Sequence, residues 1–450
     1  MFLNNHLFMK RFFFLLPLLI CHIQVLGQYK TFQGMLLSKK DSTPIEYASI
    51  QIKKVGIGTL SNEVGKFSFH FADSLSKYPI EISSIGYKSV AINTTQIMAK
   101  NADKEYVIFL EIDEILLSAI DIKEAKEGTL NIVTQAVNQI KLKYINKNHL
   151  LSGFYRELRI KDESFVHLVE ADIDIQDYGF QTPTDRAKIR VNELRKSNFD
   201  GDRSFMEKMF RRMFDKKNSL INTYTSPMIR NYISMQNDET NVTTKKFLSW
   251  FEFRLKEFSV YDGSPVYIVE YSRKGMNITQ NTQRYEEYGY LYIRKDDKTI
   301  IRQEEYFGNV GSLAKVDYQN ISFSNGLPDV FTKKLTIYKT QNGLSYPSFI
   351  ENITYQNTKE FEASLLLINN IITSRKEFDR VKNRIAQSKE KYLEDGEYEY
   401  RADFWTNYNL LLLAPLNDKV KLDLEKEKPL EVQFAENGKK ITKKKWWFWN

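Results

Sequence analysis

The spacing His167-Leu-Val-Glu170 is the pattern in this chain that comes nearest to a metal-dependent active site. A catalytic zinc ion needs three protein ligands and an open position for water, and a His-x-x-Glu pair supplies two of the three. No histidine follows His167 to supply the third. Polar and apolar residues also alternate here, which predicts a strand with His167 and Glu170 on opposite faces. We therefore predict that this pair does not bind zinc.

Other catalytic arrangements lack at least one required residue. The only cysteine is Cys21, near the N-terminus, and the chain has no Gly-x-Ser-x-Gly elbow of a serine hydrolase. Gly56-Ile-Gly58 lacks the third glycine and the following helix of a dinucleotide-binding loop. Neighbouring acids such as Glu304-Glu305 would face opposite ways on a strand, which does not favour glycosidase chemistry. We therefore expect no enzymatic activity, no cofactor and no metal; the alternative is a hydrolase with an unrecognised site.

Residues 1–27 have the features of a secretory signal peptide. Lys10-Arg11 precede the apolar run Phe12–Ile20, and small or modest residues lead up to a cleavage site after Gly27. The apolar run is too short to span a bilayer as a mature helix. We therefore expect an exported protein of the periplasm or outer membrane.

Two details of this leader have alternative interpretations. Translation starts at Met1 or at Met9, and the mature chain is either cleaved after Gly27 or lipidated at Cys21. Cleavage after Gly27 removes the only cysteine, so no disulfide can stabilise the mature chain. The formal charge falls from +8 to +6, because the leader carries two basic residues and no acid. Acids and bases interleave along the rest of the chain, and we expect no nucleic-acid partner.

The segment after the leader is predicted to contain short strands joined by glycine and asparagine turns. Every second residue from Phe67 to Phe71 is phenylalanine, the pattern of a half-buried strand. Three motifs occur in order, Pro44-Ile-Glu-Tyr-Ala-Ser-Ile50, Gly58-Thr-Leu-Ser-Asn-Glu-Val-Gly-Lys-Phe67 and Ile82-Ser-Ser-Ile-Gly-Tyr-Lys-Ser89. This order resembles the carboxypeptidase regulatory-like domain, a transthyretin-like β-sandwich of exported Gram-negative proteins, over roughly residues 29–122. The resemblance implies a non-catalytic accessory module, found beside peptidases, ahead of outer-membrane receptor barrels or on other envelope domains.

The remaining chain is predicted to be mainly β with flanking helices. We divide the sequence into a signal peptide (1–27), a β-sandwich (28–122), a helix–strand connecting region (123–235) and an antiparallel-sheet α+β domain (236–450). Helices are expected at 129–145, with Thr129 as the cap, at 203–233 and at 374–392. Hairpin turns are expected at Asp262-Gly263 and at Lys295-Asp-Asp-Lys298. The stretch Gly289-Tyr-Leu-Tyr-Ile-Arg-Lys-Asp-Asp-Lys-Thr-Ile300 resembles the lipoprotein-carrier half-barrels of the periplasm, which hold acyl chains against an aromatic-lined concave face.

Two aromatic features predict contact surfaces. Tyr288, Tyr290 and Tyr292 alternate along one expected strand, in a chain that has 26 tyrosines and 30 phenylalanines. They fit either an amphipathic ligand surface or ordinary cross-strand packing. The C-terminus, Lys443-Lys-Lys-Trp446-Trp447-Phe-Trp449-Asn450, places cations beside tryptophans, which suits the bilayer interface. A tail that folds onto its own domain explains it equally well.

These patterns predict an exported, non-catalytic binding protein of the cell envelope. We expect its partner to be an envelope protein, a glycan or an acyl ligand, with membrane-surface contact through the C-terminal tail. The alternative is an accessory module of an outer-membrane transport system of the TonB-dependent type.

Overall fold

The structure is a computed structural model of the chain. It describes residues 29–94, 105–114, 123, 125–126, 128–162, 164–180, 187–199, 224, 248–274, 279–280, 283–309, 330–356, 359–370, 398–407, 416 and 418–438. The expected signal peptide, the helix expected at 374–392, all of the one expected at 203–233 except Tyr224, and the C-terminal tail lie outside these residues. Within the described part, no helix has the length and apolar character needed to cross a membrane.

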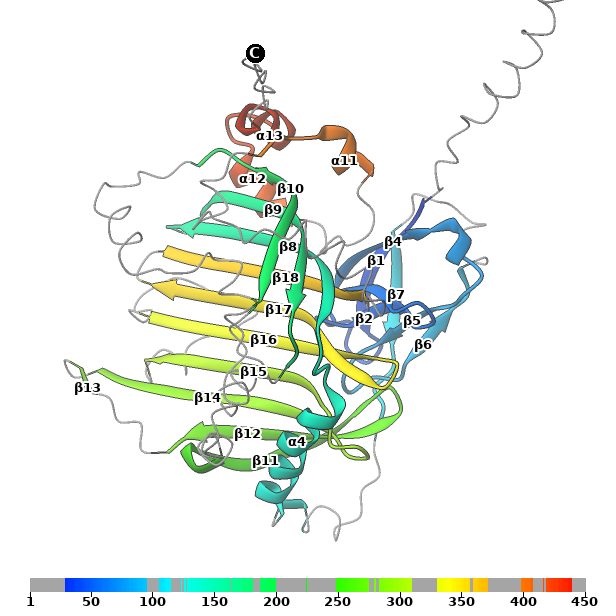
Figure 1. Cartoon of the computed structure of the whole chain (residues 1–450), viewed down its shortest axis with the longest axis vertical. Helices are drawn as coiled ribbons and strands as arrows, with labels where there is room; N and C mark the ends of the chain where they lie inside the picture. Colours follow the sequence, from blue (N-terminus) through cyan, green and yellow to red (C-terminus); the bar gives the residue numbers. More distant parts are fainter. Residues whose placement is uncertain are drawn as a thin grey trace, which may run out of the picture.

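The N-terminal domain is a β-sandwich of two small sheets (Figure 1). One sheet has the order β4-β1-β7 and the other β3-β2-β5-β6. The strands are β1 (Tyr29–Ser38), β2 (Ser49–Ile52), β3 (Ile57–Leu60), β4 (Lys66–Ala72), β5 (Ile80–Ser83), β6 (Val90–Ile92) and β7 (Tyr106–Leu110). Between the sheets lie Phe32, Phe67 and Ile50, all 1% exposed or less. This confirms the sandwich that the alternating phenylalanines predict.

The second part of the chain forms one large antiparallel sheet. Its ten strands follow the order β10-β9-β8-β18-β17-β16-β15-β14-β12-β11, with the short β13 paired to β14. The strands are β8 (His149–Lys161), β9 (Ser164–Asp177), β10 (Lys188–Lys196), β11 (Phe251–Tyr261), β12 (Ser264–Arg273), β13 (Thr279–Gln280), β14 (Gln283–Arg294), β15 (Ile300–Asn309), β16 (Val330–Gln341), β17 (Leu344–Gln356) and β18 (Lys359–Asn370). The sheet is open, with β10 and β11 at its edges.

This sheet takes strands from both regions that the sequence separates at residue 235. Strand β18 pairs with β17 on one side and with β8 on the other. The boundary at 235 therefore does not divide two sheets, because a strand late in the chain returns to pair with an early one. Figure 1 shows the strands stacked in this order, with the sandwich against one side.

Two of the hairpins in the large sheet turn through left-handed residues. Asp262 and Gly263 join β11 to β12 with φ of +53° and +73°, and Asn342 and Gly343 join β16 to β17 with φ of +52° and +76°. Two consecutive residues with positive φ match the type I′ turn, which suits the twist of paired strands. The first turn confirms the hairpin expected at Asp262-Gly263.

The helices lie at the two ends of the stacked strands (Figure 1). Near β11 lies α4 (Thr129–Lys143), and near β10 lie α11 (Ala402–Asn407), α12 (Asp418–Leu424) and α13 (Leu430–Asn437). Thr129 does not cap α4 as expected; the N-cap position is Gly128. The Thr129 hydroxyl instead donates to the carbonyls of Ala125 and Lys126, 3.0 Å away in each case, because the chain already turns before α4.

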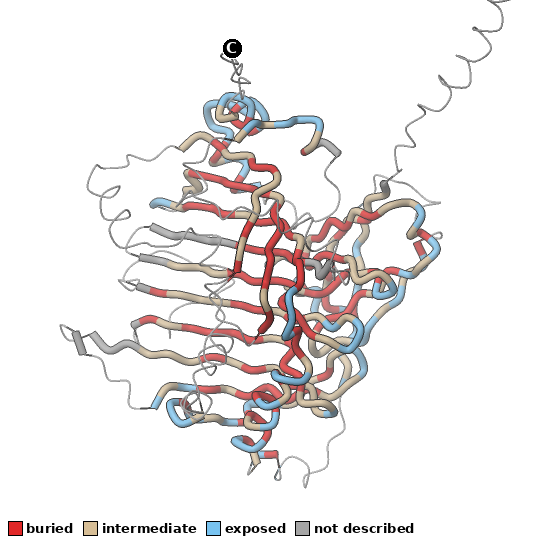
Figure 2. The backbone as a smooth tube through the Cα atoms, viewed as in Figure 1, coloured by how far each residue is buried: buried red, intermediate tan, exposed pale blue. Residues whose placement is uncertain are grey.

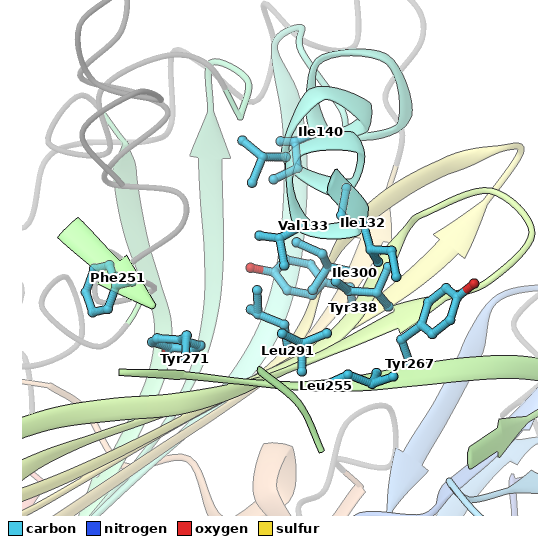
Figure 3. Packing of buried hydrophobic residues seen from close by; sticks show 14 of the residues in the cluster. Ile132, Val133, Ile140, Phe251, Leu255, Tyr267, Tyr271, Leu291, Ile300 and Tyr338 are labelled. Carbon is cyan, nitrogen blue, oxygen red and sulfur yellow. The ribbon is translucent and has the colours of Figure 1, made fainter. Parts of the chain in front are cut away.

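The two faces of the sheet have different coverings. On the face that we call the helix face, Val133 and Ile140 of α4 pack over Tyr271 and Leu291 (Figure 3). On the opposite face, the docking face, Leu60 of the sandwich shares a cluster with sheet residues and with Trp405 of α11. Figure 2 shows buried backbone running through the centre of the sheet, as both coverings require.

Candidate functional site

The three tyrosines singled out in the sequence lie together on the docking face. Tyr288, Tyr290 and Tyr292 alternate on β14, so their side chains share one face. Tyr288 stacks on Tyr306 of β15 with ring centroids 5.0 Å apart and an interplanar angle of 18°. Tyr290 meets Tyr288 edge-on at 6.2 Å. We call these four residues, Tyr288, Tyr290, Tyr292 and Tyr306, the tyrosine patch.

Glu304 on β15 fixes the inner end of the tyrosine patch. Its carboxylate accepts hydrogen bonds of 2.8 Å from the hydroxyls of Tyr292 and Tyr306. The guanidinium of Arg302 lies 2.8 Å from the same carboxylate and 5.2 Å from the Tyr292 ring. Burial opposes ionisation of Glu304, but Arg302 and the two hydroxyls outweigh it and hold the pKa of Glu304 below its usual value. This carboxylate is therefore charged and paired.

The outer end of the tyrosine patch is more open and carries charged side chains. The ammonium of Lys256, an exposed residue of β11, lies 4.4 Å from the centroid of the Tyr290 ring. Arg254 and Glu270 form an ion pair of 2.7 Å on the neighbouring strands, with Arg254 76% exposed. Tyr288 and Tyr290 are themselves half-buried. The patch therefore offers ring surface beside accessible charge.

Tyr47 of the sandwich joins the two domains next to the tyrosine patch. Its hydroxyl donates to Glu351 of β17 at 2.8 Å, and its ring lies 5.5 Å from both Arg302 and Lys333. Lys333 also lies 3.6 Å from the Glu351 carboxylate. Burial, followed by the charge of Glu351, raises the pKa of Tyr47 well above its usual value, so the hydroxyl keeps its proton and donates.

The backbone of Tyr47 adds a sign of functional constraint. Its φ is +53°, in the left-handed region where a bulky side chain is uncommon and strained. Such a conformation persists only where surrounding contacts stabilise it; here the backbone N–H of Tyr47 donates to the carbonyl of Ser61 in the sandwich, and its side chain contacts the large sheet. Sequence reasoning did not single out Tyr47 or Glu351. The available signal was the position of Tyr47 inside the motif Pro44–Ile50.

The candidate zinc pair is separated by the sheet, as the alternation of its strand predicts. The ring of His167 faces Ser197 and the carbonyl of Asn198, each at 3.3 Å. Glu170 lies on the other face of β9, where Arg156 and Arg195 hold its two oxygens at 2.7 Å. Within the described ranges, no three histidine, cysteine or carboxylate side chains gather as a metal site would require.

The geometry around the patch favours binding over proton transfer. Glu304 and Glu351 each have a cation and at least one tyrosine hydroxyl beside them. A general acid or base needs a pKa near the working pH, whereas Glu304 is held in its charged form. The other predicted contact residues, Trp446, Trp447 and Trp449, lie outside the described residues.

The comparisons with known proteins identify the N-terminal domain. Residues 32–120 match the family model of the CarboxypepD_reg-like domain, which confirms the predicted resemblance for this part of the chain. The N-terminal domain is thus a carboxypeptidase regulatory-like sandwich, and it is followed in the chain by a large open antiparallel sheet. A search of curated proteins gave no match.

Two solved structures are similar to the chain at a low level. One is a DUF1329 family protein from Desulfovibrio piger, with a TM-score of 0.23, 9% identity, and coverage of 57% of this chain and 98% of that chain. The other is a domain described as an outer membrane lipoprotein-sorting protein from Vibrio parahaemolyticus, with a TM-score of 0.21, 10% identity, and coverage of 56% and 97%. Similarity at this level carries no argument about function.

Proposed function

We propose that this protein is an exported, non-catalytic binding protein of the cell envelope, with the tyrosine patch as its contact surface. The observation that carries the proposal is the cluster of half-buried Tyr288 and Tyr290 on buried Tyr306, beside the exposed ammonium of Lys256. Tyrosine rings provide large, rigid and amphipathic contact area at low entropic cost. The CarboxypepD_reg-like domain and the leader-like N-terminus support an envelope location.

Among the candidate ligands, the patch favours a glycan over an acyl chain. Sugars present both apolar ring faces and hydroxyls. The tyrosine rings of the patch can stack on the ring faces, and the tyrosine hydroxyls and the charged neighbours can hydrogen-bond the sugar hydroxyls. An acyl chain calls for a mainly apolar cavity. The exposed charges of Lys256 and Arg254 beside the patch are costly to cover with a hydrocarbon tail, because they would then lose water.

The role of the sandwich in this proposal is to support the patch. Tyr47 packs against Arg302, which contacts Glu304 and the ring of Tyr292. Contacts of this kind fix the rotamers of a binding surface and reduce the entropy lost when the ligand binds. The sandwich thereby holds the side chains of the patch in fixed positions on the sheet.

Co-sedimentation with purified peptidoglycan sacculi tests the proposal. We expect Tyr290→Ala to weaken binding by about tenfold, which corresponds to about 1.4 kcal/mol of binding free energy. The matched control is Tyr78→Ala, since Tyr78 is also half-buried and has Lys77 5.2 Å from its ring, but lies on the sandwich. Equal binding by the original chain and both variants, or no binding at all, would contradict a glycan ligand.

Two further measurements address the alternatives. A fluorescent fatty acid that binds the original chain but not Tyr290→Ala would indicate an acyl ligand instead. Stoichiometric zinc in the purified protein would favour the hydrolase alternative, and peptide or ester turnover would establish it.

A further inference from the structure

A separate pocket lies where the sandwich meets the turns of the large sheet. Its volume is about 290 Å³, and its walls come from β2 and the turn after it, the β11–β12 turn, the adjoining ends of β14 and β15, and the β16–β17 hairpin. None of the tyrosine patch residues lines it. Pockets for small ligands are about 300–1,000 Å³, so this one suits a molecule at the small end of that range.

Basic side chains dominate the walls of this pocket. Lys53, Lys54, Arg294 and Lys339 line it, against Asp262 as the single acid of the lining. Lys53 binds both oxygens of Asp262, at 2.8 and 2.9 Å, and also pairs with Glu81 of β5 at 2.7 Å, so two carboxylates already compensate this lysine. The remaining three cations face the cavity as an excess of positive charge.

The excess cations have little compensation from the rest of the described chain. The nearest carboxylate to Arg294 is Asp297, with 3.8 Å between nitrogen and oxygen, which is too long for a hydrogen bond. Within the described residues, Lys54 and Lys339 make no ion pair. Lys54 is exposed and needs no partner, whereas Arg294 and Lys339 are half-buried, and half-buried cations normally have one.

Two buried polar atoms at the pocket also lack partners within the described residues. They are Nε of Arg294, a donor, and Oε1 of Gln341, an acceptor. Nearly all buried polar atoms in proteins are hydrogen-bonded, so an unsatisfied donor and acceptor beside one cavity indicate a missing partner. The Gln341 side chain also lies over Gly56, where an added Cβ would be 3.1 Å from its amide nitrogen. The side chain is thus held against the sandwich wall.

We propose that this pocket binds a small molecule carrying an oxyanion, a phosphate or a carboxylate, with Arg294, Lys54 and Lys339 as its charge partners. Guanidinium and ammonium groups are the usual protein partners of both oxyanions, and charge-assisted hydrogen bonds are the strong ones. Oε1 of Gln341 accepts a hydrogen bond from a hydroxyl or amine on the body of the ligand. Because the walls belong to both domains, the bound molecule bridges the sandwich and the large sheet.

Lys339 gives the site a pH signature. Burial lowers the pKa of Lys339 to about 8, because no carboxylate offsets the loss of water. The charged groups around it are Lys53 and Lys54 from the sandwich, Asp262 from the β11–β12 turn and Arg294 from β14. An oxyanion favours the protonated amine, so affinity is high below pH 8 and falls as the pH rises through 8, by up to about tenfold per pH unit.

Isothermal titration calorimetry with inorganic phosphate, glycerol 3-phosphate and succinate, each at pH 7 and pH 9 in low salt, tests this site. We expect saturable binding of at least one probe at pH 7, with Lys339→Met weakening it by about tenfold and removing the pH dependence. The control is Lys298→Met, which changes the net charge equally on a neighbouring turn outside the pocket. Tyr290→Ala should leave this binding unchanged, which separates the site from the tyrosine patch.

The outcomes decide between the site and its alternatives. No saturable binding of any probe, or equal affinity in Lys339→Met and Lys298→Met, overturns the proposal. Urea unfolding adds a second readout: Lys339→Met should be at least as stable as the original chain, whereas a loss of stability would show that Lys339 has a structural partner. Co-sedimentation with phosphatidylglycerol vesicles that Lys339→Met abolishes would assign the oxyanion to a lipid headgroup. Binding of the soluble probes alone would assign it to a free small molecule.

Discussion

Replacing Glu170 by glutamine tests how much the buried ion pairs of Glu170 on the docking face stabilise the sheet. The Glu170 side chain is fully buried, and its two oxygens are each contacted by one arginine, Arg156 or Arg195, whose side chains are 12% and 18% exposed. The neutral amide removes the buried negative charge that both of these nearly buried guanidinium groups contact. Breaking a buried pair in this way typically costs about 3–5 kcal/mol. The cost should be concentrated in β8, β9 and β10, because all three residues lie on these strands.

Hydrogen exchange followed by mass spectrometry measures this cost strand by strand. Glu170→Gln should speed hydrogen exchange in β8, β9 and β10. The control Glu270→Gln should lower the free energy of local opening by less than about 1 kcal/mol, since its partner Arg254 is 76% exposed. Equal effects of the two substitutions would refute the reasoning.

The same network predicts the acid sensitivity of the sheet. Burial opposes ionisation of Glu170, but Arg195 and Arg156 outweigh it and hold its pKa below the usual value. A carboxylate with a lowered pKa in the folded state stabilises the fold above its unfolded pKa of about 4.3. This contribution is lost as the pH falls through the lowered folded value. Glu170→Gln should therefore reduce the difference in stability between pH 7 and pH 3.

Three further changes have expected outcomes. Tyr47→Phe removes the hydroxyl that donates to Glu351, and should lower the free energy of unfolding by about 1–3 kcal/mol and speed proteolysis between the two domains. Gly289→Ala would place a Cβ 2.0 Å from a carbonyl oxygen of β15, and should cost about 3 kcal/mol or more in urea unfolding. Gly263→Ala is its control, because nothing lies within 4 Å there and only backbone strain of about 1–2 kcal/mol is added. A chain ending at Thr442 should float less with liposomes than the full chain; equal flotation would remove the membrane role proposed for the tail.

Local patterns in the sequence were sufficient for the sandwich and the hairpins. Alternating phenylalanines from Phe67 to Phe71 and the Asp262-Gly263 turn act over a few residues, and the strands and turn occur where they predict. The same alternation put Tyr288, Tyr290 and Tyr292 on one face. The partners of that face were not predictable, because Glu304 and Arg302 reach it only through the pairing of β14 with β15.

Contacts between residues far apart in the chain could not be predicted from local sequence patterns. Tyr47 and Glu351 are 304 residues apart, and no local pattern fixes which sheet face a sandwich residue will meet. The pocket has the same origin, since Lys53 and Lys339 approach each other only after the domains dock. The boundary placed at residue 235 followed the change from an expected helix to expected strands, and the pairing of β18 with β8 crosses it.

The pairing of β18 with β8 has a consequence for how the chain matures. Lys161 pairs with Lys359 and Leu150 with Asn370. The backbone donors and acceptors on this side of β8 therefore stay without their strand partner until a segment about two hundred residues later in the chain has been synthesised. Until then β8, β9 and β10 present an unprotected edge that can recruit strands from other molecules. High contact order of this kind slows folding and lengthens exposure to aggregation. The pairing of β18 is therefore the event that ends this exposure.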